Sequence, residues 1–428
     1  MTLKWAAVDG WDQVAFGRLF RKVERPVPQD AAMVTAYSDG VVTLRSNRDK
    51  IGYHEAAEMS AHQGVYPGDL VVHGLDIMRG SVGVSDSAGA ISSVCTVCVP
   101  LGPSLPAFVS YVVRAQAATG YTKALARGVR DGGADFRRWS TLAELPIPVP
   151  PVSTQKNIVE FLDRETAQID NLIAKQERLF DLLGERQNEL IHHTVSNGIR
   201  KKVNTDWTGD SPISTPEPRD SGKLLFPDFT NRTLGWKDSP VRSFLRLEST
   251  TVGDKWSETQ LLSLTKRGII PRDIESGIGK YPTSFEGYQM VYAGDLVFCL
   301  FDVEETPRTI GMAKQTGMIT NAYTRYVPDR RQVNSHYLEW LFLSFDLEKK
   351  FKPFYSGLRN TIPKQVLGST RVSLPPLEEQ RKISFYLEEK IGQIELLRSK
   401  AKEAIFYLRE RRQALISAAV TGKFEVAA

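Results

Sequence analysis

The sequence contains few cysteines and no apolar stretch long enough to cross a lipid bilayer. Three cysteines among 428 residues cannot build a disulfide framework, which argues against a small secreted fold. The first residues, MTLKWAAVDGWDQ, lack the basic and then apolar pattern of a secretory signal. No run approaches the roughly 20 apolar residues of a transmembrane helix. These absences predict a protein that works in the cytoplasm and has no membrane partner.

The sequence also lacks the motifs of several enzyme classes. It contains no GxxxxGK[ST] loop for ATP, no glycine-rich strand-to-helix turn for a nucleotide cofactor, and no Asn- or Asp-Pro-Pro-Tyr run like that of adenine methyltransferases. Its six histidines are scattered, apart from His192 and His193. A metal site at that pair would need partners that the sequence does not show. We therefore expect no catalysis, no metal and no cofactor in this chain.

Cys95 and Cys98 form a CxxC motif, a spacing that also occurs in zinc sites. They lie in the apolar, β-like run VCTVCV, where a spacing of three residues directs two side chains to opposite faces of a strand. The sequence has no second CxxC and no nearby histidine to complete four ligands. We interpret both cysteines as structural.

An internal repeat organises the chain. The segment that follows Pro150 matches the segment that follows Pro375 when the sequence is shifted by 225 residues, and no gap is needed. A weaker match lies upstream, between YPGDLVV at 66–72 and YAGDLVF at 292–298. The chain is therefore predicted to contain a duplicated unit, a globular domain followed by a long helix.

Both repeated helices carry an apolar stripe. Steps of four and three residues from Ile158 and from Ile383 meet mainly aliphatic side chains, a heptad pattern typical of helix pairs. A helix of about 40 residues is roughly 60 Å long, so a single domain cannot bury the whole stripe. The helices are predicted to pack together, and to be antiparallel because a pseudo-twofold arrangement gives both copies equivalent surroundings, although their charges fit either orientation. The predicted interface residues are Ile158, Leu162, Ile169, Leu172, Leu183, Leu190, Ile383, Leu387, Ile394, Leu397, Leu408 and Leu415.

The globular halves have the pattern of mixed domains. Short β-rich runs such as DLVVHGLDI alternate with helical patterns such as FVSYVVRAQA. The predicted fold class is α+β, with two mixed α/β domains separated by two long helices that pack as an antiparallel coiled coil in a pseudo-twofold repeat. A stretch rich in proline, serine, threonine and charge is typical of a linker. The predicted boundaries are 1–150 for the first domain, 151–198 for the first helix, 199–223 for the linker, 224–374 for the second domain and 375–425 for the second helix.

Basic residues gather just before each long helix, although the net charge of +5 is mild. No acidic residue lies among the six basic residues from Lys349 to Arg371, and five basic residues from Lys123 to Arg138 have two aspartates among them. Equivalent clusters in a repeat fit a protein that holds a polyanion at two places. A solvated surface or a fold-stabilising ion pair is the alternative for each arginine. The predicted nucleic-acid contacts are Lys123, Arg127, Arg130, Arg137, Arg138, Lys352, Tyr355, Arg359, Asn360 and Lys364.

The motif that precedes each long helix, Pro-Pro, Leu or Val, two residues and Gln, resembles the specificity subunit of type I restriction–modification systems. So does the FPDF…GW opening of the second half. The PPLEEQRKI form at 375–383 is close to that pattern, whereas the first copy departs from it at residues 152–154. The resemblance covers nearly the whole chain.

This resemblance implies a function and a set of partners. Each domain would be a target-recognition domain that reads one half of a split double-stranded DNA sequence, and the helices would set the spacing and dock two methyltransferase subunits. A nuclease–translocase subunit would join the restriction complex. S-adenosylmethionine, ATP and Mg would then be cofactors of the partner subunits. Two domains on a rod also suit two sites one or more helical turns apart on a duplex.

Two other functions remain open from the sequence. A protein-only scaffold would also use two domains and a helical rod, although the paired basic clusters argue against it. A stand-alone nuclease or methyltransferase is disfavoured by the missing motifs.

Overall fold

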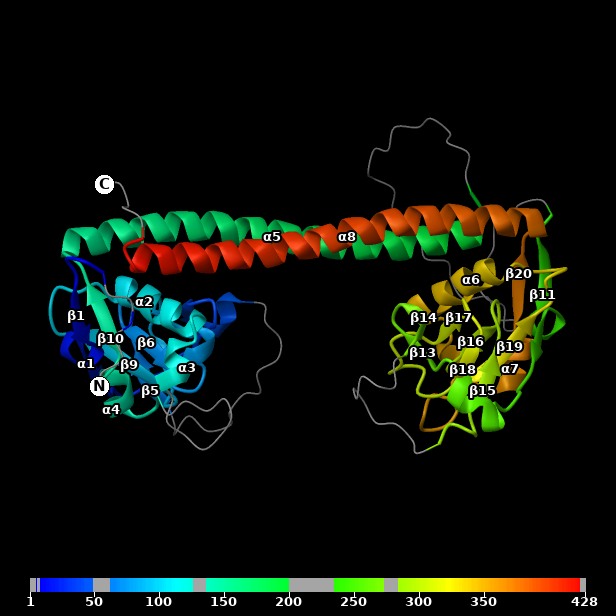
Figure 1. The fold of residues 1–428 in the computed structure, drawn as a ribbon, viewed down its shortest axis with the longest axis horizontal. Helices are drawn as coiled ribbons and strands as arrows, with labels where there is room; N and C mark the ends of the chain where they lie inside the picture. The colour runs from blue at the N-terminus through cyan, green and yellow to red at the C-terminus, as the bar shows by residue number, and fades with distance from the viewer. Residues whose placement is uncertain are drawn as a thin grey trace. The chain divides into compact units, whose positions relative to one another are not determined.

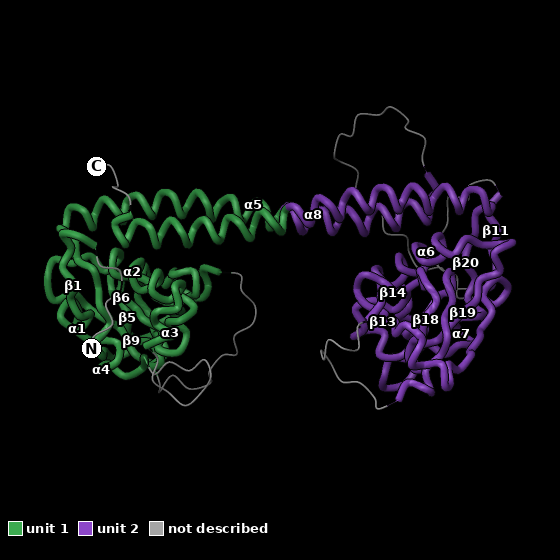
Figure 2. Tube along the Cα trace, viewed as in Figure 1, with its two compact units in different colours: residues 1–178, 401–428 green, residues 179–400 purple. Residues whose placement is uncertain are grey.

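The computed structural model describes residues 5, 8–48, 62–125, 136–199, 235–272 and 284–423 of the chain. The chain divides into two units, residues 1–178 with 401–428 and residues 179–400 (Figure 2). Two long helices contribute to both units, α5 (Val152–Asn197) and α8 (Leu377–Val420) (Figure 1). The predicted linker lies outside the described residues, apart from Ile199. Among the helices that the structure describes, none is both long and apolar enough to span a membrane.

The domain of the first unit is built on an antiparallel sheet of order β2-β9-β6-β7, against which helix α2 packs. Three two-stranded sheets, β1-β10, β3-β4 and β5-β8, accompany it. The elements are β1 (Asp12–Ala15), α1 (Phe16–Leu19), β2 (Phe20–Val23), β3 (Val34–Ala36), β4 (Val42–Leu44), β5 (His62–Val65), β6 (Leu70–His73), β7 (Val82–Val84), β8 (Gly89–Ser92), β9 (Cys95–Pro100), α2 (Pro106–Ala118), α3 (Tyr121–Leu125), α4 (Trp139–Ala143) and β10 (Pro146–Val149).

The second domain repeats this topology strand for strand. Its main sheet has the order β12-β19-β16-β17, its two-stranded sheets are β11-β20, β13-β14 and β15-β18, and α6 corresponds to α2. The duplication and the predicted α+β fold class are therefore confirmed. The elements are β11 (Lys237–Pro240), β12 (Leu245–Leu247), β13 (Leu262–Thr265), β14 (Gly268–Pro271), β15 (Gln289–Val291), β16 (Leu296–Phe298), β17 (Ile310–Met312), β18 (Gly317–Ile319), β19 (Thr324–Pro328), α6 (Ser335–Leu347), α7 (Lys364–Ser369) and β20 (Arg371–Leu374).

The apolar core of each domain includes side chains from both long helices. In the first unit, Ile158 and Leu162 of α5 and Ile416 of α8 are buried with side chains of α2 and β6. In the second unit, Ile191 of α5 and Ile383 of α8 are buried with side chains of α6 and β16. Burial of one large aliphatic side chain stabilises a fold by about 1.5–3 kcal/mol. The helix ends are therefore part of each folded domain.

The glutamine that follows each Pro-Pro pair joins the long helix to its domain. Gln380 accepts a hydrogen bond from the backbone N–H of Asn334, just before α6 (2.9 Å), and donates to the carbonyl groups of Pro375 (2.9 Å) and Gln332 (3.2 Å). Gln155 makes matching bonds, to the residue that precedes α2 (3.0 Å) and to the first proline of its own pair (2.9 Å). Both side chains are buried. The repeated motif thus has a structural role, because it fixes where each helix leaves its domain.

The repeated Tyr-x-Gly-Asp motif builds the same turn in both domains. Asp69 accepts a hydrogen bond from the backbone of Tyr66 (2.8 Å) and pairs with Arg25 (2.5 Å). Asp295 makes the same backbone bond (2.8 Å) and pairs with Arg325 (2.6 Å). The glycine before each aspartate has a φ of 90° or 92°, a conformation that glycine adopts without strain. This match between the two halves also maintains the fold.

Within each unit the long helices run antiparallel. The N-terminal part of α5 shares the first unit with the C-terminal part of α8, and the reverse holds in the second unit. In the first unit Asp170 pairs with Arg412 (2.9 Å) and Glu177 with Arg409 (2.8 Å), so residue numbers rise along α5 while they fall along α8. The predicted orientation is confirmed.

The buried stripe on the helices follows an eleven-residue repeat. On α8, Ile383 and Ile416 are buried, while Ile394 and Ile405 between them are half-buried, and each lies eleven residues from the next. The positions 158, 169, 180 and 191 of α5 show the same spacing. Eleven residues over three turns is 3.67 residues per turn, close to the period of an unstrained α-helix.

The predicted heptad stripe is therefore wrong at the middle of both helices. Leu172 and Leu397 are 46% and 51% exposed, and the half-buried position on α5 is Ile173. A strict seven-residue repeat drifts by about 20° per heptad against a straight helix, so heptad steps from one end leave the buried face after a few turns. The other predicted interface residues are buried or half-buried: Ile158, Leu162, Ile169, Leu183, Leu190, Ile383, Leu387, Ile394, Leu408 and Leu415.

The two cysteines of the CxxC motif lie on β9 and face different parts of the core. Cys98 is buried with α2, whereas Cys95 is buried with β3 and β4. The predicted opposite orientation is confirmed. Burial raises the pKa of both thiols to about 12, and metal ligation and nucleophilic attack both require the thiolate.

Candidate nucleic-acid interface

The predicted contact loop 355–365 forms a tight hairpin in the second domain. Ser356 and Thr361 are joined by an antiparallel bridge, with backbone hydrogen bonds of 2.9 and 3.0 Å in the two directions. The tip of the hairpin carries Leu358, which is fully exposed, and Arg359, whose side chain is 66% exposed. The arginine is thus presented to solvent by a backbone that is held on both sides.

An acidic turn, residues 302–305, lies against this hairpin. Arg359 pairs with its first carboxylate (Nε to Oδ1, 2.9 Å), Lys352 with its second (2.9 Å), and Asn360 donates to its third (3.4 Å). The sequence gives no acidic residue between positions 349 and 371, but the fold brings three of them to the cluster. The expected basic patch is therefore partly neutralised. The carboxylates belong to Asp302, Glu304 and Glu305.

Arg359 is held in one orientation. Asp302 accepts hydrogen bonds from both Nε and a terminal nitrogen of the guanidinium group, which lies 5.2 Å from the ring centre of Phe301. Phe301 stacks in turn on Tyr323, with 6.2 Å between ring centres. The hydrogen bond from Arg359 lowers the pKa of the Asp302 carboxyl group, so this carboxylate is charged at neutral pH.

The backbone around this pair adopts an uncommon conformation. Asp302 and Asn360 have φ values of +48° and +45°, and across the described chain only four residues other than glycine have a positive φ. The N–H of Asp302 donates to the carbonyl of Arg359 (2.7 Å), which ties the acidic turn to the hairpin. Such conformations persist where the surrounding structure fixes them, and they concentrate at functional sites.

Two other predicted contacts in this domain have different surroundings. Tyr355 packs against the core, burial raises the pKa of its phenol, and its buried hydroxyl has no hydrogen-bond partner in the part of the chain that the structure describes. This placement argues against a contact between Tyr355 and a base. Lys364 is exposed on the first residue of α7, where its side chain is accessible to a phosphate.

The matching surface of the first domain is described only in part. Arg127 and Arg130 lie outside the described residues. Lys123 is exposed on α3, while Arg137 and Arg138 are exposed just before α4. The DNA contacts of this domain therefore stay a prediction.

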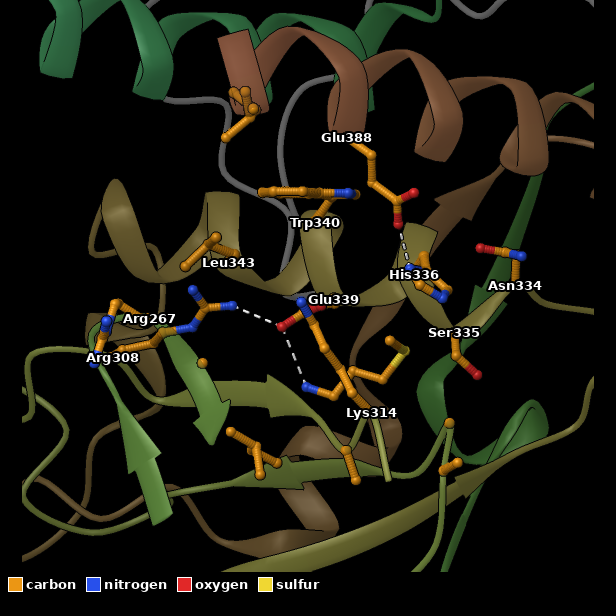
Figure 3. A pocket seen from close by; sticks show the side chains of 18 of the residues that line it. Arg267, Arg308, Lys314, Asn334, Ser335, His336, Glu339, Trp340, Leu343 and Glu388 are labelled. Carbon is orange, nitrogen blue, oxygen red and sulfur yellow. Dashed lines mark hydrogen bonds and ion pairs between the residues drawn. The ribbon is translucent and has the colours of Figure 1, made fainter. Parts of the chain in front are cut away.

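A cleft of about 1220 Å³ lies in the second unit between the sheet, α6 and α8. Figure 3 shows that its charged groups meet inside it: Arg308 donates to Glu339 of α6 (2.7 Å), and His336 of α6 pairs with Glu388 of α8. These side-chain contacts hold α6 to the sheet on one side and to the long helix on the other, so they have a structural role.

Exposed apolar side chains remain on the long helices. On α8, Phe385 and Leu396 are 70% and 58% exposed and lie eleven residues apart. Each follows a position of the buried stripe by two residues, a rotation of about 200° around the helix. This second stripe therefore points away from the partner helix, as expected for a surface that contacts another protein. The exposed apolar residues on the two helices include Leu172, Leu179, Leu182, Phe385, Leu396, Leu397, Phe406 and Tyr407.

No protein-family model and no curated protein matches the chain. Among solved structures, a chain from a study of complex assembly and conformational transition of the type I R-M system has a TM-score of 0.62 at 16% identity, with 98% of this chain and 100% of that chain covered. The HsdS subunit from Thermoanaerobacter tengcongensis has a TM-score of 0.45 at 17% identity, with 97% and 98% covered. The type I restriction–modification S subunit from M. genitalium has a TM-score of 0.38 at 14% identity, with 98% of each chain covered. The first of these confirms, at the level of the fold, the resemblance that the repeated motifs indicate.

Proposed function

Because the chain shares its fold with a component of a type I restriction–modification assembly, we propose that it is the DNA-specificity subunit of such a system. Each domain binds one half of a bipartite target, and the chain itself catalyses no reaction. The single observation that carries this proposal is the complete duplication: two domains of the same topology, each joined to both long helices. A protein with two reading domains suits a target with two half-sites.

Sequence choice and affinity come from different residues in this proposal. Base edges are read by side chains held in fixed positions, whereas flexible lysines neutralise phosphates. Arg359, which Asp302 and Phe301 hold in place, has the fixed position of a side chain that reads a base. Lys123 and Lys364 are exposed, as expected for lysines that neutralise phosphates.

The long helices set the distance between the half-sites and dock two methyltransferase subunits. Support for docking comes from the exposed stripe of α8, which includes Phe385 and Leu396. The methyltransferase subunits would bind S-adenosylmethionine, and a nuclease–translocase subunit would use ATP and Mg. The complex works in the cytoplasm, where its DNA target is found.

A protein-only scaffold is the alternative function. The neutralisation of the basic hairpin by the acidic turn favours it, because a phosphate-binding surface gains from uncompensated positive charge. Nucleic-acid binding that weakens steeply as salt is added would exclude this alternative.

The test is co-expression of the chain with its cognate methyltransferase, followed by single-molecule sequencing of the host DNA to map methylated adenines. The expected result is one split motif with a constant gap, which disappears when this chain is omitted. Methylation that is absent, or that has no split motif, would refute the proposed function. The control is the same methyltransferase expressed alone.

A further inference from the structure

The guanidinium group of Arg359 has one edge occupied and one edge available. Asp302 accepts from Nε and from one terminal nitrogen, along one side of the group. A guanidinium group has five N–H donors in a planar fork, so this pairing leaves the outer edge, with one N–H on each terminal nitrogen. The side chain is 66% exposed. The two hydrogen bonds to Asp302 define the plane of the fork, and the ring of Phe301 lies 5.2 Å from the centre of the guanidinium group.

The charges next to Arg359 distinguish a base from a phosphate as its partner. Asp302 and the two glutamates of the acidic turn would repel a phosphate that approached the same arginine. They would repel the edge of a base much less, because a base carries no net charge. Guanine presents two acceptors, O6 and N7, in the major groove at the spacing of the outer edge of an arginine. A lysine in this place could not supply both donors in a fixed plane.

From this geometry we infer that Arg359 reads a guanine in the half-site of the second domain, and that Asp302 is the residue that positions it. The inference rests on the proposed function and goes one step beyond it, because it assigns a base to a side chain. The left-handed backbone at Asp302 and Asn360 lies where the acidic turn meets the hairpin. It brings the carboxylate and the guanidinium group together on two loops that are far apart in the sequence.

The chain offers a matched control arginine. Arg331 also pairs with an aspartate through Nε and a terminal nitrogen, at 3.1 and 3.2 Å from Asp329. It is 90% exposed, its partner is two residues away along the chain, and neither residue has a positive φ. Arg331→Ala removes the same charge and the same kind of ion pair from the same domain.

The experiment uses the complex of the full chain with its methyltransferase. Methylated motifs are mapped for the wild type and for Arg359→Ala, Arg359→Lys, Asp302→Asn and Arg331→Ala. Binding to duplexes that carry the motif, with each base of the second half-site varied, is then measured at several salt concentrations. Unfolding midpoints show that each variant is folded. Asp302→Asn suits this test because asparagine tolerates the left-handed backbone at that position.

The expected result is a loss of preference for guanine at one position. Arg359→Ala and Arg359→Lys should reduce discrimination there by roughly ten- to a hundredfold, as for the loss of a bidentate contact. Asp302→Asn should reduce it less, and Arg331→Ala should leave the base preference unchanged. The slope of log K against log salt should stay the same in Arg359→Ala, because no phosphate contact is lost.

Three results would overturn the inference while the proposed function stands. One is a split motif whose base preferences are unchanged in folded Arg359 variants. Another is a uniform loss of affinity with a salt slope smaller by about one, the signature of a phosphate contact. The third is a changed preference at a position that contains no guanine on either strand. If Arg359→Ala does not fold, Arg359→Lys, which keeps the charge and the ion pair, decides between these results. A wild-type complex that methylates no split motif would instead refute the proposed function.

Discussion

Replacement of Gln380 by alanine should strongly destabilise the second domain, because this buried side chain joins the long helix to the domain. The side chain is 1% exposed and makes three hydrogen bonds, all to the backbone. Each bond of this kind stabilises a protein by about 0.5–1.5 kcal/mol net, and a buried backbone group left without a partner costs about 1–3 kcal/mol. The expected loss for Gln380→Ala is therefore about 3 kcal/mol.

The first copy provides an internal comparison. Gln155 makes two hydrogen bonds to the backbone instead of three, so Gln155→Ala should cost about 2 kcal/mol. Gln393 lies on the same helix as Gln380 but is exposed, and within the described residues its side chain bonds only to Glu389 (3.1 Å). Gln393→Ala should change the free energy of unfolding by less than about 0.5 kcal/mol.

The assay is urea unfolding of the full chain, with hydrogen exchange to locate the effect. Gln380→Ala should increase amide exchange at the start of α6, and Gln155→Ala at the start of α2. Gln380→Glu keeps the acceptor for the N–H of Asn334 but places a carboxylate against two carbonyl groups, so it should be at least as destabilising. A loss below about 1 kcal/mol for Gln380→Ala, or one equal to that of Gln393→Ala, would refute the role of the glutamine as a joint.

The two faces of the long helices should respond differently to the same substitution. Leu172→Asp combined with Leu397→Asp should change the free energy of unfolding by no more than about 0.5 kcal/mol per site, because both side chains are exposed. The same variant should weaken co-purification with the methyltransferase. Normal docking and methylation by this variant would show that neither leucine is part of the docking surface. Ile383→Asp buries a carboxylate in the core of the second domain and should cost more than about 4 kcal/mol. A native unfolding midpoint would contradict the burial of Ile383 in this core. For the thiols of Cys95 and Cys98, a pKa of about 12 leaves about one in a thousand ionised at pH 9. A thiol reagent should therefore modify them only after unfolding, and rapid labelling of the native chain, read by mass spectrometry of the two-cysteine peptide, would be the contrary result.

The sequence predicts the duplication because local patterns occur twice, and the antiparallel orientation of the helices follows from that duplication through the pseudo-twofold argument. The Pro-Pro pair ends a strand and starts a helix, and the glutamine lies a fixed number of residues later. Local chemistry decides these features, since Gln380 bonds to the backbone of its own Pro-Pro pair as well as to the domain. Such a signal is read from sequence without knowledge of the fold.

The phase of the stripe in the middle of the helices could not be predicted in this way. Leu172 and Ile173 are both aliphatic neighbours, so hydrophobicity alone does not select between them. Repeats of seven and eleven residues share their first few positions and diverge only after several turns. Counted from Ile158, the heptad template therefore succeeds at Leu162 and Ile169 and fails at Leu172.

The contact between the acidic turn and the hairpin is not visible in the sequence, because it joins residues that are distant along the chain and close in space. Asp302 and Arg359 are 57 residues apart, and their contact depends on how the end of β16 and the hairpin meet in the folded domain. A local signal is present, because three acidic residues, Asp302, Glu304 and Glu305, lie within four positions shortly after β16. Only the fold, however, identifies the partner of such a turn.

The repeated residues fall into two kinds, and the difference bears on function. Gln155 with Gln380, and Asp69 with Asp295, are buried, and their matches follow from the need to build the same joint and the same turn twice. The match between GVR at 128–130 and GLR at 357–359 is of another kind, because Arg359 is exposed and supports no core. Two domains that read different half-sites need the same framework and an equivalent place from which to read, while the residues around that place differ. Arg359, an exposed arginine at the tip of a braced hairpin, meets that requirement better than any buried match in the chain, and Arg130 holds the equivalent place in the sequence of the first half.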